Sequence, residues 1–201
     1  MKIFEEWDIR LPSYLSEDTA KELFQDLKDY PNNLGRIYTS LINGAYLYQG
    51  DGVRGLPMIH LPDTKIEQFP VLVISNTCDT DPENKRFDSP RLIYCPIVKL
   101  DRYRRFLESK KISSTRIDQY FASIRGQEIT TRFYLPVGVG LNEECVAFLD
   151  NVINCSANEL PAEDVKKNRI FSLSQYGWYI LLIKLSIHFT RVREGVNRSH
   201  K

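Results

Sequence analysis

The sequence has few cysteines, no long apolar run and almost no excess charge, and each shortage excludes a class of protein. No C-x-x-C pair occurs, which argues against a zinc ribbon or a secreted disulfide framework. The four cysteines are scattered: Cys78, Cys95, Cys145 and Cys155. The longest apolar run, Trp178 to Ile183, is far shorter than the roughly 20 residues that span a bilayer. With a formal net charge of +1, an anionic partner must be met by a local patch.

What is present predicts a globular protein without a membrane span, a metal ion or another cofactor. The 201 residues are 42% apolar and 26% charged, as in an ordinary folded domain. The opening residues, MKIFEEWDIRLP, are acidic where a secretory peptide needs an apolar run, so we expect a cytoplasmic location. We expect a helical segment over residues 1–48, a main domain over 49–194 and a mobile tail over 195–201.

Apolar periodicity and turn residues predict an α+β fold. The expected helices cover residues 16–30, 35–45, 101–111, 113–126 and 174–194, the last capped by Ser172 or Ser174. The expected strands cover residues 53–61, 70–75, 91–100, 129–135 and 145–154. The last of these could also be a buried helical turn, and its valine and isoleucine content favours a strand. Residues 79–90 and 156–168 are expected to be loops.

Three short motifs follow one another between residues 50 and 100: Gly50-Asp51, the run PVLVISN over 70–76, and IYCPIVKL over 93–100. Their order resembles that of the MazF/PemK-like family. The resemblance implies a small, strongly bent SH3-like β-barrel, here with added N-terminal, central and C-terminal helices. It also implies an intracellular toxin of a prokaryotic toxin-antitoxin or phage-defence system, an endoribonuclease that cleaves single-stranded RNA.

Two positions depart from that family's pattern. Phe69 stands where the family has a catalytic arginine, and Val98 where it has a threonine. Metal-free RNA cleavage needs a base for the 2′-hydroxyl and a cation or donor for the phosphate, and neither side chain supplies these. An endoribonuclease would use a shifted set, with Asp51 or Asp79 as base and Arg91 or Arg102 at the phosphate.

Cys78 and Asp79 stand at the end of the most apolar strand. An exposed Cys78 beside Arg86 or Arg91 could ionise and act as a nucleophile, although His60 is the sole histidine on a predicted barrel strand. Alternatively Cys78 is a small buried residue and Asp79 shapes the turn.

Two further polar groups have a functional and a structural interpretation. Asp79, Asp81 and Glu83 could hold a cation through oxygen ligands, or form a solvated acidic turn. Gln49 and Asp51 flank a glycine and could face Asp79 at the barrel mouth, or simply end a helix with an Asx-type turn.

The strongest basic segment interleaves cations with aromatic residues, as on surfaces that bind single-stranded nucleic acid. The cations are Arg102, Arg104, Arg105, Lys110 and Lys111, and the aromatic residues are Tyr103 and Phe106. A solvated helix face explains the same pattern. A second patch complements the dipole at the end of the last helix: Arg191, Arg193, Arg198 and Lys201.

A different class of function is also open. Because the catalytic positions of the family are unmatched, the barrel could be a catalytically inactive interaction module. The apolar helix over 178–189 would then dock on a partner protein or on a second copy in a homodimer.

Overall fold

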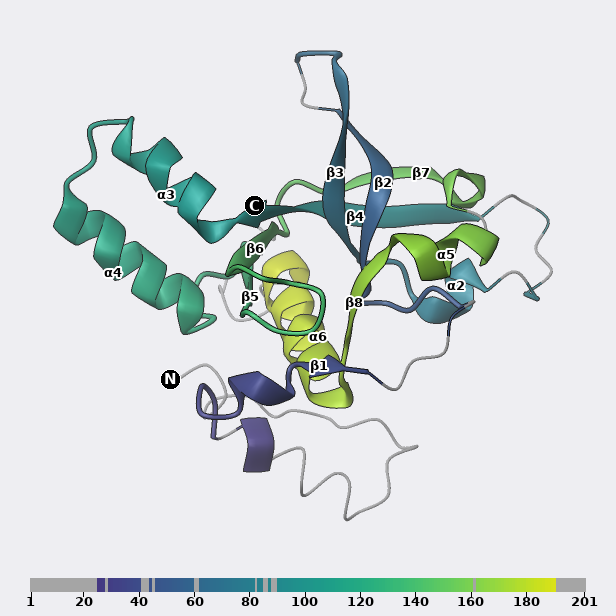
Figure 1. Ribbon diagram of the computed structural model, residues 1–201, viewed down its shortest axis with the longest axis horizontal. Coiled ribbons are helices and arrows are strands. Elements are labelled where there is room, and N and C mark those ends of the chain that lie inside the picture. The colour runs from purple at the N-terminus through teal and green to yellow at the C-terminus, as the bar shows by residue number, and fades with distance from the viewer. Residues whose placement is uncertain are drawn as a thin grey trace, which may run out of the picture.

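The computed structural model of the chain describes residues 25–27, 29–40, 44, 46–59, 62–81, 83–84, 87, 90–160 and 162–190 (Figure 1). The fold is α+β, as predicted. The strands are β1 (Tyr38–Thr39), β2 (Gly52–Ile59), β3 (Ile66–Val73), β4 (Arg91–Lys99), β5 (Arg132–Leu135), β6 (Cys145–Phe148), β7 (Ile153–Ser156) and β8 (Arg169–Leu173). The helices are η1 (Leu34–Arg36), α2 (Thr77–Thr80), α3 (Leu100–Glu108), α4 (Ser114–Arg125), η2 (Ala157–Glu159), α5 (Ala162–Asn168) and α6 (Gln175–Thr190).

The strands form one antiparallel eight-stranded sheet with the order β1-β8-β2-β3-β4-β6-β5, and β7 pairs with the first half of β4. β4 is central because its beginning pairs with β7, its middle with β3 and its end with β6. In the described part of the chain no ladder joins β1 to β5, so the sheet is not closed. The closed cylinder expected from the sequence is therefore not present as a continuous ladder.

The two ends of the strand order nevertheless meet through residues 136–141, the first part of the loop between β5 and β6. The Tyr38 hydroxyl on β1 donates to the carbonyl of Pro136 over 2.8 Å. Gly140 has a positive φ of 77° and lies so close to β8 that an added Cβ would be 1.7 Å from the Ile170 carbonyl oxygen. Packing of this loop, rather than strand pairing, bridges the gap.

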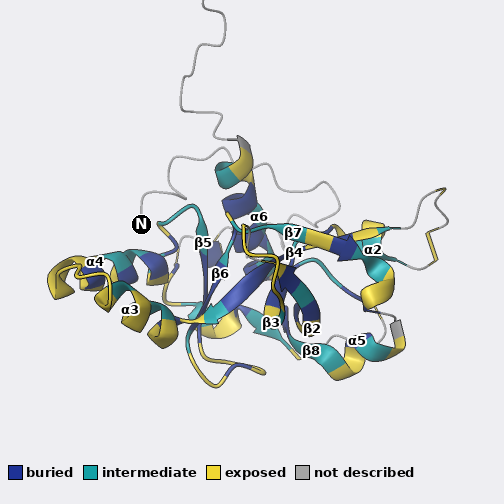
Figure 2. Ribbon diagram, turned by 90° about the horizontal axis from the view of Figure 1, so that it is seen from above, coloured by how far each residue is buried: buried dark blue, intermediate teal, exposed yellow. Residues whose placement is uncertain are grey.

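Helix α6 fills the main core under the sheet (Figures 1 and 2). It is apolar on nearly every side, and Tyr176, Tyr179, Ile180 and Leu181 pack against residues of β3, β4, β5, β6 and β8. A helix that is apolar all round is expected to be buried. Most of the helix that the sequence offered to a partner is therefore covered within the chain, although Trp178, Leu182 and Ile187 are only half-buried and Phe189 is 61% exposed.

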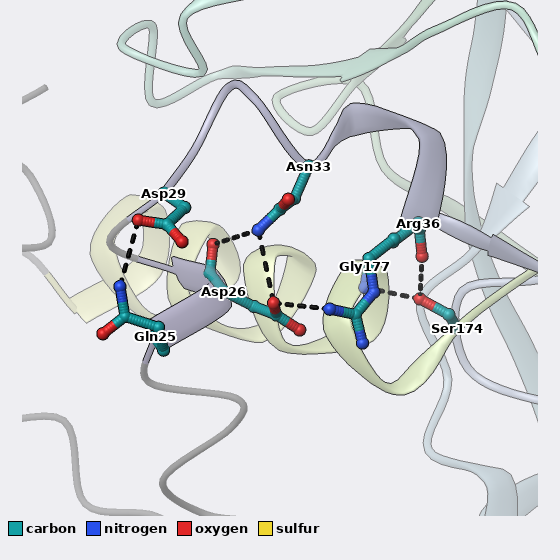
Figure 3. A network of polar contacts seen from close by, with 7 residues as sticks. All are labelled: Gln25, Asp26, Asp29, Asn33, Arg36, Ser174 and Gly177. Carbon is teal, nitrogen blue, oxygen red and sulfur yellow. Dashed lines mark hydrogen bonds and ion pairs between the residues drawn. The ribbon is translucent and has the colours of Figure 1, made fainter.

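The N-terminal segment is fixed to the start of α6 by polar contacts (Figure 3). Ser174 is the N-cap, as predicted: its hydroxyl accepts from the Gly177 N–H and donates to the carbonyl of Arg36. Arg36 also pairs with Asp26 over 2.6 Å, and Asn33 donates to the same carboxylate. Leu27, Tyr30 and Ile37 also belong to the same buried cluster as α6, so this segment shares the core of the main domain.

Several predicted elements differ in the structure. The helical spacing over 35–45 is wrong at residues 38–39, which form β1, and residues 41–43 and 45 lie outside the described residues. Residues 145–154 form strand, as predicted, but a turn at 149–152 separates β6 from β7. The predicted loop 156–168 contains η2 and α5, and β8 was not expected. Of the predicted helix 16–30, residues 25–27 are helical and residues 16–24 and 28 lie outside the described part.

Candidate functional site: the α3 surface and the two ends of strand β4

The Gly50-Asp51 motif forms a tight, enclosed turn at the start of β2. Gly50 has a φ of 91°, a conformation that favours glycine, and its N–H donates to Val73 of β3. The Asp51 carboxylate accepts from the Tyr48 N–H over 3.0 Å. Gln49 is held on both sides of its amide, by Trp178 and by the carbonyl of Ile74. The motif therefore has a structural role, but it is not the helix-ending Asx-type turn that the sequence suggested: residues 46–48 are not helical, and the carboxylate bonds back to residue 48 and not to the N–H two residues on.

Asp51 is fully buried and forms an ion pair with Arg169 of β8, with 2.9 Å between Oδ2 and Nε. Burial raises the pKa of Asp51, and the contacts with Ser172, Tyr48 and Arg169 oppose that rise. Arg169 also donates to the carbonyl of Tyr46. Because no solvent reaches Asp51, this carboxylate stabilises the fold and does not form the rim base that the sequence suggested.

Cys78 and Asp79 lie exposed on the four-residue helix α2. Asn76 is its N-cap and accepts from the Cys78 N–H over 3.0 Å, so Asn76 helps to shape the turn. The alternative of a buried Cys78 is wrong, whereas the other three cysteines are buried. Across the described residues, no group of three or more His, Cys, Asp or Glu side chains could hold a metal ion, so the acidic residues from 79 to 83 do not converge.

Arg91 lies exposed at the start of β4, near the loop that carries α2. Its guanidinium donates to the side chain of Asn154 on β7, and its carbonyl accepts from the Ser75 hydroxyl over 3.4 Å. Helix α3 follows the other end of the same strand, and β4 spans roughly 26 Å. Arg91 and Arg102 therefore lie too far apart to contact one phosphate together. His60, Arg86 and the tail cations from Arg191 onward lie outside the described residues.

Helices α3 and α4 form a hairpin that projects from the sheet beyond the end of β4 (Figure 1). Residues 100–125 carry seven arginines and lysines against three acidic residues, an excess of four positive charges in a chain of net charge +1. The hairpin is therefore a local basic region of a near-neutral chain.

One side of α3 concentrates the exposed cations and an exposed aromatic ring. Arg102, Arg105 and Phe106 occupy positions i, i+3 and i+4, which share one helix face. Lys110 in the following turn places its ammonium 5.1 Å from the centre of the Phe106 ring. We refer to these four residues as the α3 stripe. Phe106 is 54% exposed, and Figure 2 shows most of α3 as exposed or intermediate.

Two residues predicted for this surface face the interior of the hairpin instead. Arg104 pairs with Asp118 of α4 over 2.6 Å and lies over the ring of Phe121. Tyr103 packs against aromatic rings of α4 and β6, and its hydroxyl is 3.3 Å from that of Tyr120. These contacts hold α3 against its neighbours. The polar groups of both residues have partners within the hairpin, so neither residue belongs to the exposed basic surface. Arg105 pairs with Asp101, but this exposed pair is easily exchanged for another partner.

A polar chain fixes the base of the hairpin to the sheet and to α6. Arg125 at the end of α4 binds Glu144 through two hydrogen bonds of 2.7 and 2.6 Å, which lower the pKa of Glu144. The Tyr134 hydroxyl donates to the same carboxylate. Gln127 is hydrogen bonded to the backbone of Tyr134, and Lys184 of α6 donates to the carbonyl of Gln127 over 2.8 Å. The projecting surface therefore has a rigid base.

Sequence reasoning missed Arg169 and Lys184. Lys184 is 3% exposed and donates to the carbonyls of Gln127 and Ile129, and burial together with Arg132 lowers its pKa to about 7. A lysine that interrupts an apolar helix was a visible signal. The sequence carries no comparable signal for Arg169, because its partner Asp51 is far away in the sequence.

Comparison with known proteins adds no relative to this description. No family model matches the chain, and no curated protein matches it. Within the described residues, no helix has both the length and the apolar character needed to cross a membrane.

Proposed function

We propose that this protein binds RNA through the α3 stripe. The observation that carries the proposal is the excess of four positive charges in one projecting hairpin of a near-neutral chain. Phosphate contacts by arginine and lysine supply most of the affinity of non-specific nucleic-acid binding, because they release the counterions condensed on the nucleic acid. Arg102, Arg105 and Lys110 present three such cations on one face.

The proposed family context is the MazF/PemK-like group of toxin-antitoxin or phage-defence proteins, with a strongly bent SH3-like barrel. The antiparallel sheet, the Gly50 turn and the contact of the 136–141 loop with β1 and β8 support this proposal. Fewer observations support RNA cleavage than support RNA binding. Of the two bases suggested by the sequence, Asp51 is enclosed and Asp79 is exposed. Strand cleavage would therefore depend on Asp79, with Arg91 at the same end of β4.

Charge reversal on α3 tests the proposal. Purified protein is titrated against a fluorescently labelled unstructured RNA at low salt, and binding is followed by anisotropy. The double variant Arg102→Glu/Arg105→Glu is expected to raise the Kd by about tenfold or more, because two attractions to phosphate become repulsions. Arg54→Glu, at an exposed position on β2, is the matched control and is expected to leave the Kd unchanged.

Equal affinities for the double variant and the wild type would contradict the proposal, as would an absence of binding by the wild type at low salt. The same RNA is inspected for cleavage products. Any cleavage by the wild type is expected to disappear in Asp79→Ala and to survive in Cys78→Ala, which separates the ribonuclease from a thiol-dependent enzyme.

A further inference from the structure

Phe106 has no packing role that explains its position. The buried residues of the hairpin core include Leu100, Ile117, Phe121 and Ile124, whereas the Phe106 ring points away from that core and is 54% exposed. The neighbouring positions that face α4 are already filled by Tyr103 and Leu107. An exposed ring between two arginines and a lysine is an arrangement that suits an unpaired base.

The contact with Lys110 strengthens this interpretation. The ammonium lies 5.1 Å from the ring centre, which places a cation on the π-system of Phe106 while about half of the residue stays accessible. A base that stacks on the ring would have Arg105 next to it on the helix and the Lys110 ammonium in contact with the same ring. The backbone positions of the three cations extend over about 12 Å, from Arg102 on α3 to Lys110 in the turn after Glu108. At the spacing of stacked bases, this length corresponds to roughly three or four nucleotides.

We infer that Phe106 is a base-stacking platform and that the α3 stripe is an accessory subsite for an unpaired strand, three or four nucleotides long. This inference rests on the proposed function and goes beyond it, because the subsite lies on the projecting hairpin, a full strand length from Arg91 and Asp79. Paired bases keep their faces stacked on each other, so a duplex meets the cations of the stripe but not its ring.

Substitution of the ring separates stacking from charge. Phe106→Ala is expected to weaken binding of an unstructured 12-nucleotide RNA by about 5- to 100-fold. Binding of a duplex of the same length is expected to change less than about twofold. Phe106→Trp is expected to retain or tighten single-strand binding. Phe189→Ala, at a ring that is 61% exposed on α6, is the matched control and is expected to have no effect.

Salt dependence gives a second, independent readout. Each phosphate contact with a single-stranded RNA contributes about −0.7 to the slope of the logarithm of the binding constant against the logarithm of the salt concentration. Three cations that each contact one phosphate therefore predict a slope near −2. Phe106→Ala removes no charge and is expected to keep that slope, whereas Lys110→Gln is expected to reduce it by about 0.7.

The outcomes distinguish this inference from the proposed function. If Arg102→Glu/Arg105→Glu abolishes binding but Phe106→Ala binds the single strand as the wild type does, RNA binding stands and the stacking platform is overturned. A duplex affinity that falls with Phe106→Ala as much as the single-strand affinity would also overturn it. If the wild type binds no RNA, the proposed function fails first. Circular dichroism and thermal melting of each variant verify that the exposed substitution leaves the fold intact.

Discussion

At the scale of single residues, the buried pair of Asp51 and Arg169 shows why a motif at a strand mouth need not be a reactive one. Both side chains are enclosed, and each satisfies backbone groups near residue 48 in addition to its partner. Removal of one member leaves an uncompensated charge in the interior, whereas removal of both leaves two neutral groups.

Arg169→Met is therefore expected to lower the free energy of unfolding by about 3–5 kcal/mol. The double variant Asp51→Asn/Arg169→Met is expected to be more stable than Arg169→Met alone. Urea denaturation of the three proteins measures the difference. Lys65→Met, which breaks the exposed pair with Glu67, is the control and is expected to leave the midpoint unchanged. Additive losses in the double variant would contradict the assignment of a buried ion pair.

Gly140 provides a second test at this scale. Its φ is 77°, and an added Cβ would be 1.7 Å from the Ile170 carbonyl oxygen. Gly140→Ala is expected to destabilise the protein by more than about 2 kcal/mol, because backbone strain and a backbone clash combine. Gly55→Ala is the matched control: Gly55 has a φ of 86° with open space around it, so it reports strain alone. Equal shifts in Tm for the two variants would show that the loop is not pressed against β8.

At the scale of elements, the sequence predicts best where one segment determines its own structure. β4 and α4 were expected close to their observed bounds, because an apolar Val/Ile run and an i, i+3, i+4 stripe are local signals. β8 was missed because its strand character depends on pairing with β1 and β2, which are distant in the sequence. The helix α5 did carry a local signal: acidic residues in its first turn and lysines in its last complement the helix dipole.

The candidate site divides in the same way. The basic and aromatic residues of α3 could be predicted from their spacing, and Arg102, Arg105, Phe106 and Lys110 lie on one surface as that spacing suggested. That Arg104 is not part of this surface could not be predicted, because its position depends on contacts with Asp118 and Phe121 of α4. Asp51 appeared accessible in the sequence, and only the position of β8 beside β2 shows that it is enclosed.

At the scale of the whole molecule, Lys184 makes stability depend on pH. Its pKa is lowered to about 7 in the folded protein, so between that pH and 10.5 the unfolded chain binds more protons than the native one. The free energy of unfolding consequently rises with pH across this window, by at most about 1.4 kcal/mol per unit from this group. This gain in the free energy of unfolding is fully present above pH 10.5 and absent below about pH 7.

Lys184→Met removes this titration. We expect the variant to be less stable than the wild type at high pH, because the carbonyls of Gln127 and Ile129 lose their donor. We also expect its free energy of unfolding to lack the rise between about pH 7 and 10. Urea denaturation at several pH values measures both effects, and the buried tyrosines affect the two proteins alike. Parallel pH profiles for variant and wild type would contradict the position given to this amine.

The place of α6 at the centre of the core has a consequence for synthesis. A nascent chain that has left the ribosome only as far as Ser174 has all the strands of the described sheet but lacks the helix that covers their apolar side. Such an intermediate exposes Leu72, Ile97 and Phe133 to water, which makes it prone to aggregation and a substrate for chaperones. The protein can therefore complete its fold only after α6 has left the ribosome. Until then the α3–α4 hairpin projects from a sheet that is not yet stably folded.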